Sequence, residues 1–230
     1  MKRKLFCEIS PLTYKISVEK NILQRRLRDM LARERFAQVR SSRLLPMVIY
    51  SHKSLIRRKL GSVDMRLQEN KAVNLSLAAP RVTGILIKPG ETFSFWRLVG
   101  RDSRRKGYLD GLTISNGKVS EGTGGGMCQF SNLIHWLVLH SELTITEHHH
   151  HDGFDLFPDF GRQIPFGTGT SIMYNYLDYR FRNETDRVYQ FIVHTDGEYL
   201  FGELRADKPQ SVSFQIKSLG ERFVRENGTV

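Results

Sequence analysis

The sequence predicts an α+β fold, and three observations support this. Apolar residues recur at helical spacing in a basic N-terminal segment, a second helical pattern follows a glycine run, and the last third is rich in aromatic and β-branched residues. With 230 residues, 40% of them hydrophobic, the chain can bury a sizeable core. We expect a basic helical segment over 1–66, a mixed domain over 67–207 with a cysteine-bearing helix and a C-terminal antiparallel sheet, and a final strand with a polar tail over 208–230.

Positive charge is concentrated in the first 66 residues. They contain 17 Lys and Arg residues against 5 acidic ones, a net charge of +12, while the whole chain carries +11. From about Lys15 to Arg43, arginines fill the positions between regularly spaced apolar residues, which predicts a basic amphipathic helix that ends by Pro46. Such a helix fits an anionic membrane surface or a solvated cap on the main domain equally well. Without a recognised nucleic-acid motif, we expect no nucleic-acid partner.

The middle of the chain predicts alternating short elements. A helix is expected over Glu69–Ala79, where Pro80 and Gly84 break it, followed by a strand at Ile85–Lys88 and a turn at Pro89-Gly90. Four apolar residues that follow are core candidates: Phe93, Phe95, Leu98 and Val99.

The C-terminal third predicts strands. The β-rich stretches are Ile172–Phe181, Val188–His194 and Tyr199–Arg205, and the Asp196-Gly197 pair is a typical hairpin turn between the last two. Residues Val212–Lys217 are expected to add one more strand.

No apolar run is long enough to span a bilayer, and the first residues lack the apolar region of a secretory signal. We therefore expect a cytoplasmic protein, with the inner face of the membrane as its docking surface if the basic helix binds lipid. In a reducing compartment the two cysteines, Cys7 and Cys128, are expected to be free thiols.

The strongest chemical signal is a glycine run that leads into Cys128 at the start of a helix predicted over Met127–His140. In the first helical turn, unpaired N–H groups and the helix dipole favour an anion, which predicts a lowered thiol pKa. Gly124, Gly125 and Gly126 let the backbone approach a substrate and turn N–H groups toward an oxyanion. The alternative is a structural thiol, because free cysteine is often buried as a small apolar residue.

A nucleophilic cysteine needs a base, and a run of four histidines follows the helix. His135 lies two turns from Cys128, roughly 10 Å away, which is too far for a hydrogen bond. His149 and His151 in the run are the better candidates, with Glu147 or a nearby aspartate to orient the ring. The run also suggests a metal site, but its spacing lacks the usual i, i+3 or i, i+4 pattern, so we expect no metal and no cofactor.

Several motifs between Lys71 and Arg205 are specific enough to indicate a known family. They are Asn74 with Ala78-Ala79, Pro89-Gly90-Glu91-Thr92-Phe93-Ser94-Phe95, Val99-Gly100, Gly107-Tyr108, Gly124-Gly125-Gly126-Met127-Cys128-Gln129 and Phe181-Arg182-Asn183-Glu184-Thr185. The chain resembles the VanW family. The resemblance implies a role in vancomycin resistance and in peptidoglycan chemistry. Some members are implicated as cysteine-dependent L,D-transpeptidases, which would make Cys128 the nucleophile and His151 the conserved loop histidine, with Gln129 and Arg162 as substrate-binding residues.

Two hypotheses follow from these observations. In the first, Cys128 transfers an acyl group of a peptidoglycan stem peptide, with His151 or His149 as base and the glycine amides holding the oxyanion. In the second, the chain is a non-catalytic module that binds a peptidoglycan precursor or the inner membrane surface.

Overall fold

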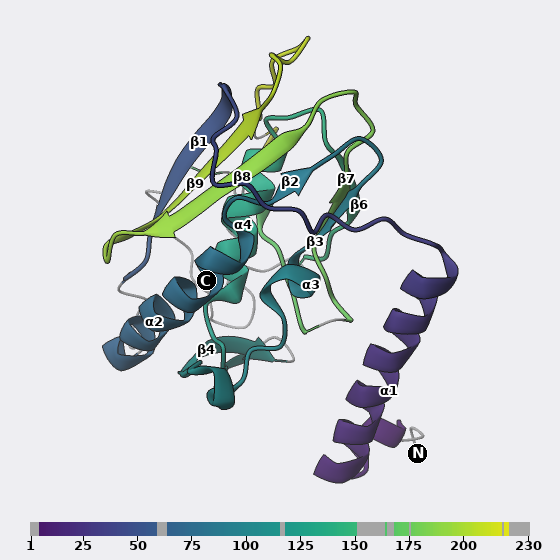
Figure 1. Ribbon diagram of the computed structural model, residues 1–230. Helices are drawn as coiled ribbons and strands as arrows, with labels where there is room; N and C mark the ends of the chain where they lie inside the picture. Colours follow the sequence, from purple (N-terminus) through teal and green to yellow (C-terminus); the bar gives the residue numbers. More distant parts are fainter. Residues whose placement is uncertain are drawn as a thin grey trace.

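The computed structural model describes residues 5–58, 64–115, 118–150, 164, 168–174, 176–217 and 219–220. Helices and antiparallel sheets form this part of the chain, which confirms the α+β class (Figure 1). The helices are η1 (Phe6–Glu8), α1 (Pro11–Leu31), α2 (Met65–Val82), α3 (Phe95–Val99), η2 (Arg104–Lys106) and α4 (Met127–Val138). The strands are β1 (Met47–Leu55), β2 (Leu86–Ile87), β3 (Thr92–Ser94), β4 (Asp110–Ser115), β5 (Lys118–Thr123), β6 (Thr144–Glu147), β7 (Arg180–Arg182), β8 (Tyr189–Thr195) and β9 (Tyr199–Ala206).

The main sheet has the order β1-β9-β8-β2, and smaller sheets pair β3-β7-β6 and β4-β5. The hairpin of β8 and β9 has the predicted turn, in which the Asp196 side chain accepts hydrogen bonds from the backbone N–H groups of Glu198 and Tyr199. Alternate residues of β9 point inward, and the predicted β-rich pattern is therefore confirmed for this hairpin.

Helix α4 packs on the inner face of the main sheet. Its predicted apolar face is almost completely buried, with exposures of 0–1% for Phe130, Leu133, Ile134, Leu137 and Val138. Gly202 on β9 permits this close approach, because a Cβ atom there would lie 2.9 Å from side-chain atoms of Leu133 and Leu137. The sheet therefore fixes the position of the helix that carries Cys128.

The predicted N-terminal helix is corrected at its C-terminal end. Helix α1 stops at Leu31, and Arg33 adopts a left-handed φ of 51° that ends the helical path. The following residues are extended because their backbone is bonded elsewhere: the N–H of Ala37 donates to Thr92 and the N–H of Ser41 to Gly84.

Strand β1 was not predicted, since Met47–Leu55 lies inside the segment expected to be helical. It pairs antiparallel with β9 from Met47↔Ala206 to Leu55↔Tyr199, with an irregularity between Val48 and Tyr50. The main sheet therefore uses residues from both sides of the boundary expected at residue 66.

Three other expectations need correction. Helix α2 continues past Pro80 to Val82. Proline has no N–H group to donate to the carbonyl of Ser76, and the helix tolerates this loss because Ser76 and Pro80 are both exposed to solvent. Of the described residues in the expected strand Ile172–Phe181, only Arg180 and Phe181 join a sheet, as part of β7. Residues 212–217 form no strand, and Val212 and Phe214 stay exposed there.

Helix α1 is held by a buried ionic cluster. Asp29 accepts two hydrogen bonds from the Arg180 guanidinium at 2.7 and 2.9 Å, and Arg180 also donates to the fully buried Asp178. Arg25 of α1 pairs with Glu147 on β6. The apolar residues of α1 contribute little to this attachment, because Ile22 is the one that becomes buried among the described residues of the helix.

Candidate functional site

Cys128 is the second residue of α4, as the sequence predicts. Gly126 begins the helix with a left-handed φ of 106°, and its carbonyl accepts hydrogen bonds from the N–H groups of Gln129 and Phe130. The amides of Gly126, Met127 and Cys128 therefore precede the first intrahelical hydrogen bond. The thiol lies in the first turn of a helix whose other end is fixed in the core.

The predicted lowering of the Cys128 pKa is wrong. The thiol is partly exposed, but the protein atoms around it disfavour the thiolate, and burial raises its pKa above the ordinary value. A hydrogen bond from the backbone N–H of Ile172 favours the thiolate, but its effect is smaller than that of burial. At neutral pH the resting thiol is protonated, in contrast to the activated nucleophile expected from its position at the helix start.

The glycine run fills a tightly packed space. A Cβ atom on Gly125 would lie 2.3 Å from the carbonyl carbon of Gly111 on β4, and one on Gly124 would lie 1.9 Å from the Asp102 carboxylate. A Cβ atom on Gly126 would lie 2.3 Å from Cγ of Lys71 on α2. Each glycine is therefore required by a different neighbour, and close packing explains the run without a substrate.

Two of the three expected oxyanion donors are already bonded within the protein. The N–H of Gly124 donates to the carbonyl of Leu109 at 3.0 Å, and the N–H of Gly125 donates to Gly122 at 3.3 Å. The predicted oxyanion hole of Gly124, Gly125 and Gly126 is therefore corrected. Gly126 and the two amides after it are the helix-start donors that remain.

Asn74 of α2 holds in place the loop formed by Gly124, Gly125 and Gly126, called the glycine loop below. Its Nδ2 donates to the carbonyls of Leu109 and Gly125 at 3.0 and 2.9 Å, and its Oδ1 accepts from the Leu109 N–H at 2.8 Å. The side chain is fully buried. This residue belongs to the motifs that indicated the family, and the structure gives it a structural role.

The described histidines do not contact the thiol. His148 stacks on His135 at 4.2 Å, and His135 Nδ1 lies 2.9 Å from the hydroxyl of the buried Tyr179. Burial lowers the pKa of His135 to about 3, so this ring stays neutral. Among the residues that the structure describes, no hydrogen bond joins Cys128 to a histidine ring.

His149 belongs to the ionic cluster that holds α1. Its Nε2 lies 2.9 Å from Glu147, and burial lowers its pKa. The catalytic role expected for His149 therefore competes with a structural contact. His151 and Arg162, the other expected site residues of this loop, lie outside the described residues.

Gln129 connects α4 to β1. Its side-chain nitrogen donates to the Ser54 hydroxyl at 2.9 Å and to the Leu55 carbonyl at 2.8 Å. Both hydrogens of this amide are thus used within the fold. A substrate-binding role for Gln129 is restricted to its side-chain oxygen.

Sequence reasoning missed two buried polar residues on α2. Lys71, 7% exposed, lies against Gly126, and burial with the nearby Arg58 and Arg57 lowers its pKa to about 7. Gln68, 1% exposed, lies one turn earlier on the same helix face. The only signal for Lys71 in the sequence was its place in the predicted helix that also carries Asn74, and Gln68 lies just before that predicted helix.

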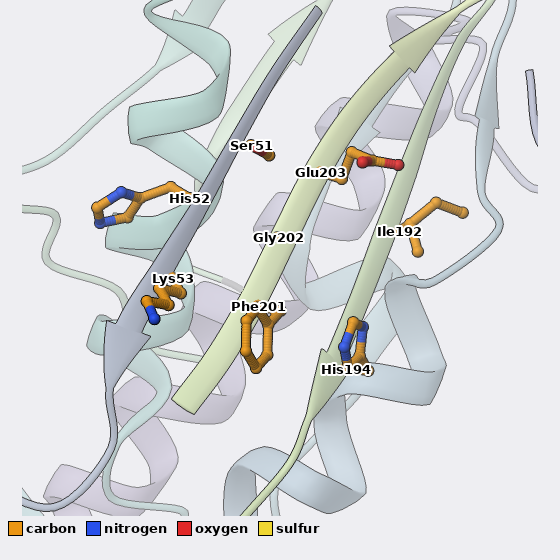
Figure 2. Close-up of a pocket in the computed structure, with 8 residues that line it drawn as sticks. All are labelled: Ser51, His52, Lys53, Ile192, His194, Phe201, Gly202 and Glu203. Carbon is orange, nitrogen blue, oxygen red and sulfur yellow. The ribbon is translucent and has the colours of Figure 1, made fainter. Parts of the chain in front are cut away.

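A hollow of about 370 Å³ lies on the other face of the main sheet (Figure 2). Its lining includes Phe201 and Glu203 of β9, with His194 of β8 and Lys53 of β1. Phe201 and Glu203 flank Gly202, whose Cα faces α4, and they therefore point away from this helix. The hollow is separated from Cys128 by the sheet itself.

No cluster of three or more His, Cys, Asp or Glu side chains with the geometry of a metal site occurs in the described part of the chain. Within the same residues, no helix has the length and apolar character that a membrane span requires.

Comparison with known proteins identifies the family. Residues 70–205 match the family model described as VanW like protein. The chain belongs to the VanW family. Over 195 residues it is 40% identical to the vancomycin B-type resistance protein VanW of Enterococcus faecalis (strain ATCC 700802 / V583), which covers 85% of this chain and 70% of that protein.

A second similar protein is matched over a shorter part of the chain. An uncharacterized protein of Bacillus subtilis (strain 168), YoaR, is 32% identical over 119 residues, which are 50% of this chain and 36% of that protein. No solved structure matches the chain. The region that the family model matches begins inside α2 at residue 70 and contains Lys71, Asn74, the glycine loop and α4, while Gln68 lies just before it.

Replacement of Gly125 by alanine tests the packing role of the loop. The new Cβ would overlap the Gly111 backbone, which no side-chain rotation relieves. We expect Gly125→Ala to lower the free energy of unfolding by about 2–4 kcal/mol in urea denaturation. Gly197→Ala is the control, since Gly197 has open space around it and should lose about 1 kcal/mol from its positive φ alone. Equal losses in the two variants would contradict the packing argument.

The lowered pKa of Lys71 predicts a dependence of stability on pH. Between about pH 7 and its ordinary value of 10.5, the unfolded chain binds a proton at Lys71 that the folded chain has released, so stability rises with pH in this window. We expect Lys71→Met to remove up to about 2–3 kcal/mol of the gain in unfolding free energy between about pH 7 and pH 9. The exposed Lys88→Met should leave the gain unchanged, and an unchanged gain in Lys71→Met would refute the shift.

Proposed function

We propose that this VanW-family chain contributes to vancomycin resistance by binding a peptidoglycan stem peptide or precursor at the start of α4. The link to resistance rests on its 40% identity to a protein named for that function. The choice of binding over acyl transfer rests on the packing around Cys128, which engages the Gly124 and Gly125 amides within the fold and raises the pKa of the thiol by burial. A protonated thiol with two of its expected oxyanion donors engaged is a poor resting nucleophile.

Acyl transfer by Cys128 is the second candidate. It is favoured by the partial exposure of the thiol and by the Ile172 N–H, which would stabilise the thiolate. In this candidate His151 would act as the base, and an amine of a second stem peptide would resolve the thioester.

Replacement of Cys128 by serine separates the two functions. In a vancomycin-resistant host whose own gene for this protein is deleted, the binding function predicts that Cys128→Ser restores the inhibitory concentration of vancomycin as fully as the wild type does. Acyl transfer requires a large loss in the same assay, because a serine hydroxyl is a much weaker nucleophile than the cysteine thiol that it replaces. A deletion strain with unchanged resistance would remove the proposed role itself.

The pH dependence of Cys128 alkylation by iodoacetamide, in a Cys7→Ser background, gives an independent measurement on the purified protein. We expect a midpoint above the free-thiol value of about 8.5. A midpoint below this value would favour acyl transfer.

We also propose that α1 docks on an anionic membrane surface. The helix carries the exposed cations Lys15, Lys20, Arg26 and Arg28. It also leaves large apolar side chains in solvent, with exposures of 44–77%: Leu12, Tyr14, Ile16, Leu23, Leu27, Met30 and Leu31. Basic and apolar side chains together are typical of interfacial helices.

Liposome co-sedimentation tests this docking. Binding to vesicles that contain an anionic lipid should weaken as salt rises, and Leu23→Glu should reduce it several-fold. Leu109→Glu, a change at an exposed leucine outside α1, should have little effect. Binding that is absent, or equally strong to neutral vesicles, would refute the proposal.

A further inference from the structure

Two largely buried side chains on α2 carry hydrogen-bond donors that have no acceptor among the described residues. The side-chain oxygen of Gln68 accepts the backbone N–H of Arg58 at 3.3 Å, but its Nε2 has no partner although it is inaccessible to solvent. Three residues later on the same face, Lys71 makes no hydrogen bond or ion pair with any residue that the structure describes, although 93% of its surface is buried. Buried donors in native proteins are almost always paired. The buried Nε2 of Gln68 therefore indicates a missing acceptor, and Lys71 adds an unpaired ammonium group on the same face of the helix.

The charges around Lys71 make the missing acceptor an anion. The groups that act electrostatically on its ammonium are Arg58 and Arg57, and both are positive. The carboxylate of the exposed Glu69 forms an ion pair with Arg57, so it is already neutralised by another cation. A buried cation without a counter-ion is strongly unfavourable, and a bound negative group would remove this penalty.

The start of α4 lies against the side chain of Lys71. The stem of Lys71 crosses Gly126, the residue that begins the helix, so closely that a Cβ atom there would overlap Lys71 Cγ. The positive end of the helix dipole and its unpaired amides favour an anion at this place. The unpaired Nε2 of Gln68 and the unpaired ammonium group of Lys71 are observations independent of the helix, and one anionic group could accept hydrogen bonds from both.

We infer that Gln68, Lys71 and the start of α4 form a binding site for an oxyanion, the chemistry shared by a carboxylate and a phosphate. Lys71 would neutralise the negative charge, and Gln68 Nε2 would donate a neutral hydrogen bond to one oxygen. The inference rests on the proposed function in one respect: it identifies the part of a stem peptide or precursor that the site binds as its anionic group.

Isothermal titration of the full chain tests the site with two simple probes. Inorganic phosphate represents the phosphate source, and N-acetylglycine represents the carboxylate end of a peptide. N-acetylglycine methyl ester is the neutral control, which should not bind. We expect saturable binding of at least one of the two anions, and the tighter one identifies the source.

Matched variants locate the binding. Lys71→Met should weaken the anion about ten-fold or more, and Gln68→Leu should weaken it several-fold. Lys88→Met and Gln24→Leu change the same residue types at exposed positions and should leave the affinity within about two-fold. Circular dichroism confirms that each variant is folded before titration.

The outcomes distinguish this site from the proposed function. If neither anion binds the wild type, or if Lys71→Met binds as tightly, the oxyanion site is wrong even where the gene restores resistance. If the Lys71→Met variant no longer binds the anion but restores resistance fully, the oxyanion site is supported and its link to the proposed function is refuted. Loss of both supports the site and the function together.

Discussion

The position of Cys128 and of the start of α4 depends on how the glycine loop packs against α2. Asn74 bonds both sides of the loop, while Gly125 lies directly on the backbone of Gly111. No side chain larger than hydrogen fits between these two strands of backbone. This contact fixes where α4 begins, and the sheet fixes the rest of the helix through Gly202. The direction of Cys128 follows from these two restraints.

The same packing changes the chemistry expected of the loop. A glycine loop that served as an oxyanion hole would keep its amides free, but a loop that must lie flat on β4 uses them to satisfy its own backbone. The tight surroundings also desolvate Cys128, and this desolvation is the largest effect on the pKa of its thiol, which it raises. Two polar side chains on α2 instead keep donors without partners: Gln68, through its buried Nε2, and Lys71, whose stem lies against the start of α4.

The parts of the fold that local patterns encode were predictable. The apolar face of α4 and the Asp196-Gly197 hairpin require only neighbours in sequence, and both are confirmed. Strand β1 was missed because its stability comes from β9, about 150 residues away, and not from a strong pattern of its own. The sequence shows the glycine run but not why it is needed, because the groups that leave no room for a Cβ atom, in Lys71, Asp102 and Gly111, belong to other segments of the chain. The unpaired state of Lys71 is likewise a property of its surroundings, invisible in the residue type.

The loop also separates two buried groups that could otherwise have neutralised each other. Asp102 lies against Gly124, and burial raises its pKa to about 6, while Lys71 lies against Gly126 with a pKa lowered to about 7. The charges that act on Asp102 are those of Arg101 and Lys106, and those that act on Lys71 are the two arginines after β1. Desolvation therefore disfavours the charge on each group separately, because the pair does not meet. A fold selected for stability alone would gain by joining them or by replacing Lys71 with an apolar residue of similar size. Keeping the lysine apart from this acid leaves its charge available to a group from outside the chain.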